Sequence, residues 1–513
     1  TVFAGSSAQT LVVNGTGFLP VFLGSIQDGG IVGGTGANFF LEGILALLGT
    51  NTYTGSTTVA GYLLLAENGS IASSSGVNIL TNSFLDVSNT IPGTTINNLS
   101  GSGFVSLGSS DQTLIVYETS PTTFSGVMRD GGFPNTNAVG GNFAKSGPAT
   151  LTLSGLNNYT GSTFVQEGTL ALLAEGSVAS SRVFVLSSAI FDISETTSEA
   201  LIQGLSGFGT VSLGGSALTV YTTLPSNFSG TIQDGGIGGG TAGQLFKSGP
   251  ATFILSGINT YTGNTTVQEG TLLVNGSITS DVMVYDGATL GGAGTVEGSV
   301  SIDSLAVLTH GSTFTIRESA YVYGTIDLGD EASEIVIGEN LVLESGSILN
   351  IYIGDSGNSL VSVGGSIMID SSSTVNFLTV PGYNLLNHDF IFMRSDSGDV
   401  FGQFSTITAN TILIHPIISY FDGYVVGNYV LANFPSLISQ SNALHVAASL
   451  KEEMLSRNAA FGGVFASLLP LDASDLTTAF NQMQPALLKA LAISSENNVI
   501  KVHDGRSEER RVG

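Results

Sequence analysis

One stretch of this sequence occurs three times, and that repetition limits what the chain can fold into. "LTLSGLNNYTGSTFVQEGTLALLAEGSV" begins at Leu151, and close copies run as "ILSGINTYTGNTTVQEGTLLVNGSI" from Ile254 and "NTYTGSTTVAGYLLLAENGSI" from Asn51. A catalytic motif needs one copy, whereas a stacked structure is built by repeating a unit. The repetition therefore predicts a structural unit before it predicts chemistry.

The repeat has a period of about a hundred residues. The tyrosines of the three Tyr-Thr-Gly triplets are Tyr53, Tyr159 and Tyr261, separated by 106 and 102 residues. The three Asp-Gly-Gly triplets keep a similar step and begin at Asp28, Asp130 and Asp234. "LSGSGFVSLG" from Leu99 returns as "LSGFGTVSLG" from Leu205. Each unit is long enough to hold several strands.

Short strands are indicated within each unit. Apolar and polar residues alternate over 151–154, 163–165 and 169–172, with Glu167-Gly168 between the last two. Such runs are typical of half-buried strands, and a sandwich or barrel would also fit them. The repetition favours a parallel solenoid with about 20 residues per coil and coils about 4.8 Å apart. Glycines then turn the corners, and Asn157 or Asn158 beside Tyr159 can bond the turn backbone.

Composition excludes several classes of protein. Charged residues make up 10% of the chain, hydrophobic residues 42%, and there are 69 glycines, which suits strands and tight turns and excludes a disordered chain. A net charge of −26 with 13 Lys and Arg argues against nucleic acid and anionic membranes as partners. Without cysteine there can be no disulfide, thiolate metal site or cysteine nucleophile.

The composition of the sequence changes near Ser436. Six basic residues lie in 1–440 and seven in 441–513, where eight acidic residues balance them. The face of a first expected helix is formed by Leu444, Ala447, Leu450 and Met454. A second helix is expected from Asp472, as N-cap, to a point before Pro485, which can open a third. The last residues, "GRSEERRVG", are either a flexible end or not native.

These motifs resemble the autotransporter-associated β-strand repeat of bacterial type V secretion passengers. The resemblance rests on the Tyr-Thr-Gly block with "VQEGTL" and then "NGSI" or "EGSV"; the copy from Ile44 departs from it at Ala60-Gly61-Tyr62. "LGGAGTVEG" from Leu290 resembles a linker common in such passengers. "SNALHVAASLKEEML" and "AFNQMQPALLKALA" are similar to the helical segment before the translocator barrel.

The resemblance covers most of the chain and implies an all-β fold. It implies a right-handed parallel β-helix over 1–434, with three repeats of about 104 residues and a C-terminal cap near 401–434. Residues 435–513 would form a short α-helical linker toward an outer-membrane β-barrel. We expect a signal peptide before Thr1 and about a dozen amphipathic strands after Gly513.

The resemblance also implies a function. The chain is expected to be displayed on, or released from, a Gram-negative outer membrane as a structural spacer or adhesin without catalysis of its own. The implied partners are its own β-barrel, the barrel-assembly machinery and a host-surface or cell–cell receptor, with no nucleic acid. A rod that merely carries an effector located upstream is a further hypothesis.

A protease site is the first catalytic alternative. Gly354-Asp355-Ser356-Gly357 resembles the nucleophile loop of trypsin-like proteases, which some autotransporters carry, and His310 lies upstream. The loop, however, stands between the strand-like runs "LNIYI" and "NSLVSVGG". A turn is favoured over a nucleophile.

A β-helical carbohydrate-active enzyme is the other catalytic alternative. Such enzymes need clustered carboxylates, whereas the Asp-Gly-Gly aspartates lie about a hundred residues apart and are expected to be turn residues. Gly291-Gly292-Ala293-Gly294 lacks the Asp of a calcium-binding nonapeptide and the following Lys of a phosphate loop. The five histidines are scattered. We therefore predict no catalytic, cofactor-binding or metal-binding residue.

Overall fold

In the computed structural model the chain divides into two compact units, Thr1–Val300 and Ser301–Gly513, which are treated separately. The structure describes residues 1–5, 9–15, 17–31, 33–379, 388–433, 443–444, 446–448, 450–451, 464, 467–468 and 471–483. The described residues up to 433 form strands and turns without a helix, as expected for an all-β chain.

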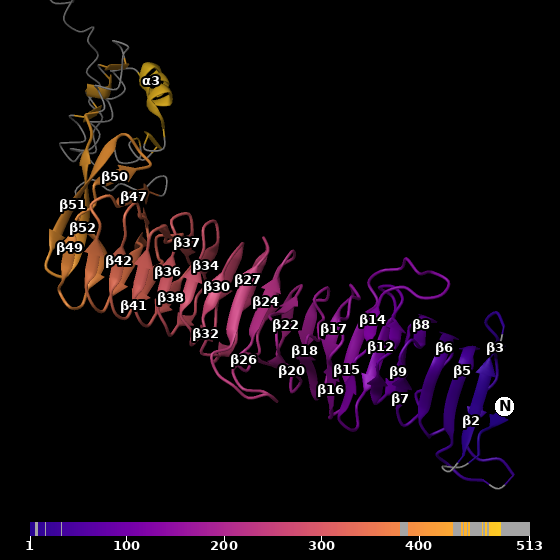
Figure 1. Cartoon of the computed structure of the whole chain (residues 1–513). Helices are drawn as coiled ribbons and strands as arrows, with labels where there is room; N and C mark the ends of the chain where they lie inside the picture. Colours follow the sequence, from indigo (N-terminus) through magenta and orange to yellow (C-terminus); the bar gives the residue numbers. More distant parts are fainter. Residues whose placement is uncertain are drawn as a thin grey trace, which may run out of the picture. The chain divides into compact units, whose positions relative to one another are not determined.

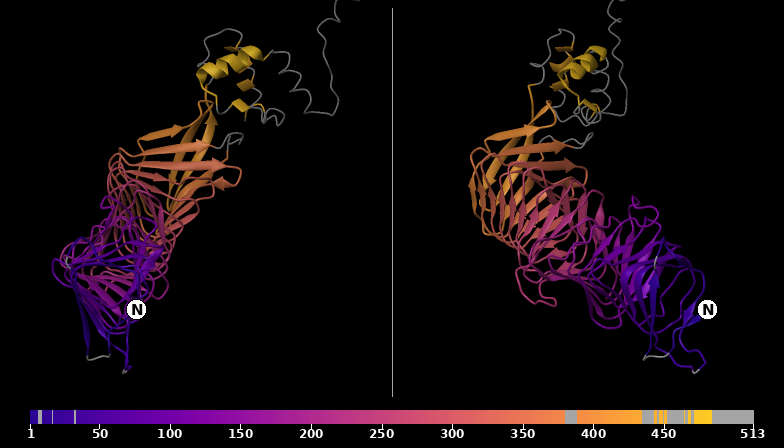
Figure 2. Two further views of the ribbon diagram at one scale, coloured as in Figure 1. Left: turned by 90° about the vertical axis from the view of Figure 1, so that its right-hand side faces the viewer. Right: turned by 45° about the vertical axis from the view of Figure 1, so that its right-hand side comes forward.

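The first unit is built from parallel strands that stack side by side (Figures 1 and 2). A short sheet pairs β1 (Val2–Phe3) with β4 (Ile26–Gln27). A long sheet, the first face, has the order β14 (Val127–Arg129), β11 (Phe104–Ser106), β8 (Phe84–Thr90), β6 (Thr57–Glu67), β7 (Val77–Ile79), β10 (Leu99–Gly101), β13 (Thr122–Phe124), β16 (Thr150–Leu153), β18 (Thr169–Ala174), β20 (Ile190–Thr196), β23 (Thr210–Ser212) and β26 (Thr231–Gln233). Joined to it are β2 (Thr10–Gly15), β3 (Val21–Phe22) and β5 (Asn38–Leu47).

Three further runs of strands complete the first unit. The second face holds β9 (Gly93–Asn97), β12 (Thr113–Tyr117), β15 (Asn142–Ser146), β17 (Thr163–Val165), β19 (Val183–Val185), β22 (Leu205–Gly207), β25 (Ser226–Phe228), β28 (Thr252–Leu255), β31 (Thr271–Val274) and β34 (Thr289–Gly291). The third holds β21 (Ala200–Ile202), β24 (Ala217–Tyr221), β27 (Gln244–Ser248), β30 (Thr265–Val267) and β33 (Val282–Val284). The last run is β29 (Ile258–Asn259), β32 (Ser277–Ile278) and β35 (Thr295–Val296).

The register of these strands defines a parallel β-helix. Gly93 pairs with Thr113 and Val183 with Leu205, so one coil takes about 20 residues, as predicted. Equal positions of successive coils stack into ladders, for example the buried side chains of Leu151, Leu170, Phe191, Val211 and Ile232. Burial of these ladders inside each coil supplies the core of the solenoid.

The sequence repeat does not return to the same face of the helix. The equivalent strands β7, β19 and β33 belong to three different sheets, and β12 and β24 likewise to two. Each repeat therefore turns the pattern by about a third of a coil. Figure 1 accordingly shows a long loop on the upper side near β14 and another on the lower side near β26.

The first copy lacks one corner that the other two contain. Lys145 and Lys247 are fully buried at this corner, and each Nζ donates to three carbonyl oxygens, those of Ser146, Gly147 and Glu167 in the case of Lys145. In the first copy Leu41 occupies the lysine position, and β5 and β6 run straight through where Ala60-Gly61-Tyr62 replaces the corner sequence. The departure seen in the sequence thus removes a bend and the lysine that holds it.

The second unit continues the same pattern within its own residues. β36 (Val300–Ile302) contains the last residue of the first unit and the first two of the second. Parallel runs are β37 (Val307–Thr309), β40 (Thr325–Asp327), β43 (Ile348–Gly354), β47 (Thr374–Thr379) and β50 (Thr406–Ala409); β39 (Ala320–Val322), β42 (Leu341–Leu343), β46 (Ile367–Ile369) and β49 (Val400–Gly402); and β38 (Thr313–Ile316), β41 (Glu334–Ile337), β45 (Leu360–Val363) and β48 (Phe390–Ser395). β44 (Gly357–Asn358) pairs with β43 in antiparallel fashion.

An antiparallel hairpin and a helix follow in this unit. β51 (Ile414–Phe421) and β52 (Tyr424–Leu431) form the hairpin, and β52 pairs with β48. Helix α3 (Ala473–Gln482) has Asp472 as its N-cap and ends before Pro485, as predicted. None of the helices among the described residues combines the length and apolar character needed to cross a membrane.

One detail of the expected helices is wrong. Residues 443–444, 446–448 and 450–451 are helical, but Leu444 is 39% exposed, whereas Ala443, Val446, Ala447 and Leu450 are buried. The buried face is therefore rotated from the expected one, because Val446 and not Leu444 packs into the interior. Met454, a helix from Pro485 and the end "GRSEERRVG" lie outside the described residues.

Candidate functional site

The copied stretch forms a hydrogen-bonded joint between coils. Asn157 is buried; its Oδ1 accepts from the backbone N–H of Met128 at 2.8 Å, and its Nδ2 donates to the carbonyls of Gly155 and Ser177 at 3.0 and 3.1 Å. Asn51 and Asn259 make the equivalent bonds in the other copies. From the sequence, either Asn157 or Asn158 could bond the turn backbone; in the structure Asn157 makes these hydrogen bonds.

The conserved spacing of tyrosine within the three copies has a similar cause. The buried hydroxyl of Tyr159 lies 2.5 Å from Oγ1 of Thr163, which lies 2.7 Å from Oγ of Ser181 on the next coil. Tyr53 and Tyr261 stand at the head of the same chain of hydroxyls. Burial raises the pKa of Tyr261 to about 12, so the phenol stays neutral and either hydroxyl of the Tyr261–Thr265 pair can donate.

The Asp-Gly-Gly aspartates bind backbone of a neighbouring coil. Asp130 accepts from the N–H of Gly141 at 2.9 Å and from the N–H and Oγ1 of Thr160 at 3.0 and 2.6 Å. Thr160 belongs to the Tyr-Thr-Gly triplet. Asp28 and Asp234 make the corresponding bonds. Their carboxylates are thus occupied in structure rather than gathered in one groove.

The loops that follow the second and third Asp-Gly-Gly triplets are also bound by a carboxylate that lies two coils away. Asp86 accepts from the N–H of Phe133 at 2.7 Å, and Asp192 accepts from that of Ile237 at 2.8 Å. A Cβ on Gly132 would lie 2.2 Å from Oγ of Ser88, so this position takes only glycine. The loop clamps three coils together.

The protease-like residues are not assembled into a site. Asp355 and Ser356 form the turn between β43 and β44, where Gly354 pairs with Gly357. His310 is 5% exposed, and it follows β37 at the inward position below Leu328. Burial lowers the pKa of His310 and favours its neutral form. No hydrogen bond within the described part of the chain joins His310 to Ser356.

The glycine run 291–294 allows neighbouring coils to pack closely. A Cβ on Gly292 would lie 2.1 Å from the carbonyl oxygen of Val274, and one on Gly294 the same distance from that of Gly276. Gly292 also has a φ of +126°. These glycines let two coils approach each other. Among the described residues, no group of three or more His, Cys, Asp or Glu could hold a metal ion.

Aromatic rings form a second feature on the first unit. Phe84 and Phe104 stack with centroids 4.9 Å apart, Tyr62 continues the ladder at 5.8 Å from Phe84, and the Tyr62 hydroxyl bonds the carboxylate of Asp86. Arg129 Cζ lies 5.3 and 5.4 Å from the two phenylalanine centroids. Being equidistant from both rings, the guanidinium lies beside the stack rather than on one face. This cluster supports the clamped loop.

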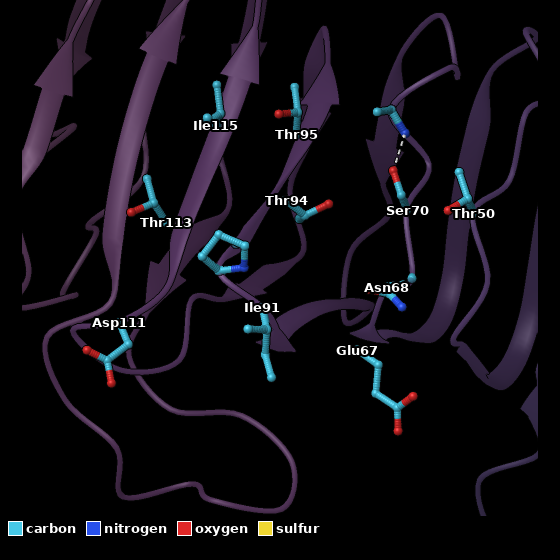
Figure 3. Close-up of a pocket in the computed structure, with 14 residues that line it drawn as sticks. Thr50, Glu67, Asn68, Ser70, Ile91, Thr94, Thr95, Asp111, Thr113 and Ile115 are labelled. Atoms are coloured by element: carbon cyan, nitrogen blue, oxygen red, sulfur yellow. Dashed lines mark hydrogen bonds between the residues drawn. The ribbon is translucent and has the colours of Figure 1, made fainter.

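A groove of about 840 Å³ lies on the first unit, where β9 begins the second face (Figure 3). Thr94, Thr95 and Thr113 line it with hydroxyl groups, and the carboxylates of Glu67 and Asp111 lie at its margin. Sequence reasoning missed this groove, because its residues come from four successive coils and share no motif. Only the exposed pair Ile91-Pro92, in a chain with 12 prolines, could have marked an irregular corner.

The β-helix and the three structural joints define a passenger-type solenoid, and comparison with known proteins identifies the repeat. The family model described as passenger-associated-transport-repeat matches residues 42–63, 143–172 and 245–274, which are the segments around the lysine corner and its straight counterpart. The chain carries three of these repeats, which confirms the resemblance to autotransporter passengers.

Two relatives support the same family. The chain is 32% identical over 285 residues, 52% of its length, to the Adhesin BmaC autotransporter of Brucella suis biovar 1 (strain 1330). It is 26% identical over 220 residues, 41% of its length, to an extracellular serine protease of Serratia marcescens. The chain spans 8% and 19% of the lengths of these relatives.

The repeat family bears on where the protein lies. A passenger with these repeats is extracellular, at the cell surface and tied to the outer membrane, as the resemblance implied.

Proposed function

We propose that this chain is the spacer and adhesive part of an autotransporter passenger and performs no catalysis of its own. The observation that supports this most is the threefold joint of Asn, Tyr and Asp, which uses every prominent repeated side chain to hold coils together. A surface left for function must then come from residues outside the repeat. The relative named an adhesin agrees with such a role.

The proposal includes a division of the chain. Residues 1–434 form the β-helical passenger with three repeats and a cap, and residues 435–513 form the helical linker to the protein's own outer-membrane barrel. The stacked coils favour such an export route, because each new coil buries apolar surface on the one before it. Insertion of the barrel by the barrel-assembly machinery and contact with a host-surface or cell–cell receptor belong to the same proposal.

Display and adhesion test this function together. The complete gene is expressed in a non-adherent Gram-negative host, and surface exposure is measured with an antibody on intact cells. We expect display and binding to epithelial cells or to sister cells. A matched gene that lacks residues 1–300 keeps the second unit and reports binding that does not need the first. Displayed protein without any gain in adhesion would contradict the adhesive role and leave a spacer.

A protease is the second candidate, because one relative is named an extracellular serine protease. Ser356 lies in an exposed two-residue turn, so Ser356→Ala is expected to change no activity toward peptides or glycans. Cleavage of casein by the wild-type chain, with loss in Ser356→Ala, would overturn the non-catalytic proposal. Cleavage that survives in the variant would show a nucleophile elsewhere.

A further inference from the structure

We infer that the groove below β9 binds an extended peptide segment that carries lysine or arginine. This deepens the adhesive role proposed above by naming the class of ligand, but it is carried by the groove itself. The groove lies wholly within the first unit, and its volume of about 840 Å³ falls within the usual range for ligand sites.

The first support is an open sheet edge. β9 is the last strand of its sheet, with β12 paired on one side and no strand of the described chain on the other. The segment below it bonds the end of β9, where the amide of Asn97 donates to the carbonyls of Ala72 and Ser74 at 2.8 Å, and it bonds the chain just before β9, where the N–H of Ile91 donates to the carbonyl of Glu67 at 3.4 Å. The start of β9, at Gly93–Thr95, therefore borders the groove. An exposed edge accepts an extended peptide through main-chain hydrogen bonds.

The second support is a hydroxyl group in the groove that no neighbouring group of the described chain binds. Thr94 is 8% exposed and lines the groove, and within the described residues its side chain has no hydrogen-bond partner. Figure 3 shows this hydroxyl directed across the groove toward the segment of Ser70. A ligand that reaches this hydroxyl can add a hydrogen bond that the described residues do not make.

The third support is charge. Glu67 and Asp111 are exposed at the margin, and neither carboxylate has a partner among the described residues. No basic and no aromatic residue lines the groove. Two unpaired carboxylates complement a cationic side chain, and the lack of a ring for stacking disfavours a sugar. An extended peptide with Lys or Arg fits both the edge and the charge.

The second repeat provides an internal comparison, because it carries the same corner without these features. Ala174, Ala200 and Gly215 stand at the positions of Glu67, Thr94 and Asp111. Its Glu175 accepts instead from Thr197 at 2.7 Å and from Ser198 at 3.3 Å, so this carboxylate is engaged within the corner. The groove chemistry is thus absent from the second repeat, whose backbone forms the same corner without it.

The test uses the purified 513-residue chain and a fluorescein-labelled hexapeptide of alternating Lys and Val, with binding measured by fluorescence anisotropy. We expect saturable binding that weakens with salt, and loss of binding when the lysines of the probe are acetylated. Glu67→Ala/Thr94→Ala/Asp111→Gly, which copies the second repeat, should weaken binding about tenfold or more. Asp355→Asn/Asp422→Asn removes the same charge elsewhere and should leave it within about twofold.

A single substitution separates the hydroxyl from the charges. Thr94→Val keeps the size of the side chain and should weaken binding a few-fold at every salt concentration. Equal binding by the triple variant and the wild-type chain would overturn the proposal, as would no binding at all. Binding of a neutral N-acetylglucosamine hexasaccharide in place of the peptide would overturn it in favour of a glycan site. These outcomes are independent of adhesion by whole cells, which tests the proposed function.

Discussion

At the residue scale, buried ionisable groups show what the stacking of coils imposes on single side chains. Glu118 is fully buried; its Oε1 accepts from the N–H of Leu99 at 3.0 Å, while its other oxygen has no partner among the described residues. Burial raises the pKa of Glu118 to about 7, although Lys145 on the next coil acts in the opposite direction. Thr222 stands at the equivalent position of the following repeat and donates to the carbonyl of Ala251 at 2.9 Å.

Glu118→Gln should therefore stabilise the protein at pH 8. The folded-state pKa lies above the unfolded value, so the stability supplied by the protonated carboxyl is lost as pH rises from about 4.5 to 7. Glutamine keeps the acceptor for Leu99, and we expect a gain of roughly 1–3 kcal/mol at pH 8 and little change at pH 4. Hydrogen exchange of the β9 and β12 amides measures it. An equal effect at both pH values would contradict a titrating Glu118.

His310 predicts the opposite pH dependence in the second unit. Burial lowers its pKa below the ordinary value of 6.5, so the unfolded chain binds the proton more readily. Stability in this unit should fall as pH drops below about 6.5, and His310→Leu, which extends the apolar ladder toward Leu328, should remove that loss. Hydrogen exchange of β37 and β40 at pH 7 and 5 checks this. His388→Leu, at an exposed position, is the control.

At the element scale, the sequence was sufficient where the information is local. The expected strands over 151–154, 163–165 and 169–172 correspond to β16 (Thr150–Leu153), β17 (Thr163–Val165) and β18 (Thr169–Ala174). The lysine corner could not be predicted, because the carbonyls around Lys145 come from two coils that are 22 residues apart in sequence. The groove below β9 could not be predicted for the same reason, because its lining residues also come from different coils.

The asparagine joint gives a prediction with a neighbouring control. Asn157→Ala removes three hydrogen bonds and leaves the N–H of Met128 buried without an acceptor, so it should cost about 2–4 kcal/mol of local stability. Asn158 is exposed, and Asn158→Ala should cost less than about 0.5 kcal/mol. Limited proteolysis and hydrogen exchange around β14 report both. Similar losses in the two variants would contradict the joint.

At the scale of the whole molecule, period and architecture are separate properties. The period of about a hundred residues was evident from the sequence, but the turn of about a third of a coil per repeat was not, because it depends on how many corners each repeat contains. The lysine corner and its absence in β5 and β6 change that number. A sequence pattern records which residues are equivalent and leaves open which face they occupy.

This rotation predicts that the first unit tolerates removal of one complete repeat. Deleting residues 143–244, which is 102 residues, joins Asn142 to Leu245. Leu245 and Lys247 then take the positions of Phe143 and Lys145 in the strand that pairs with β12, and Asn259 takes that of Asn157 beside Met128. Thr262 likewise replaces Thr160 as the partner of Asp130. Every joint is restored although the following strands move to a different face.

The shortened chain should therefore fold with the circular dichroism of a β-structure and remain protease-resistant, whereas deletion of residues 143–234 should not. The second deletion is ten residues shorter but joins positions that are not equivalent. Buried apolar positions would then stack on corner residues, and the asparagine of the joint would not face its hydrogen-bond partners. Thermal unfolding followed by circular dichroism compares the two with the full chain. If both deletions fold equally well, the equivalence of repeats does not govern stacking; if neither folds, the repeats are coupled to particular faces.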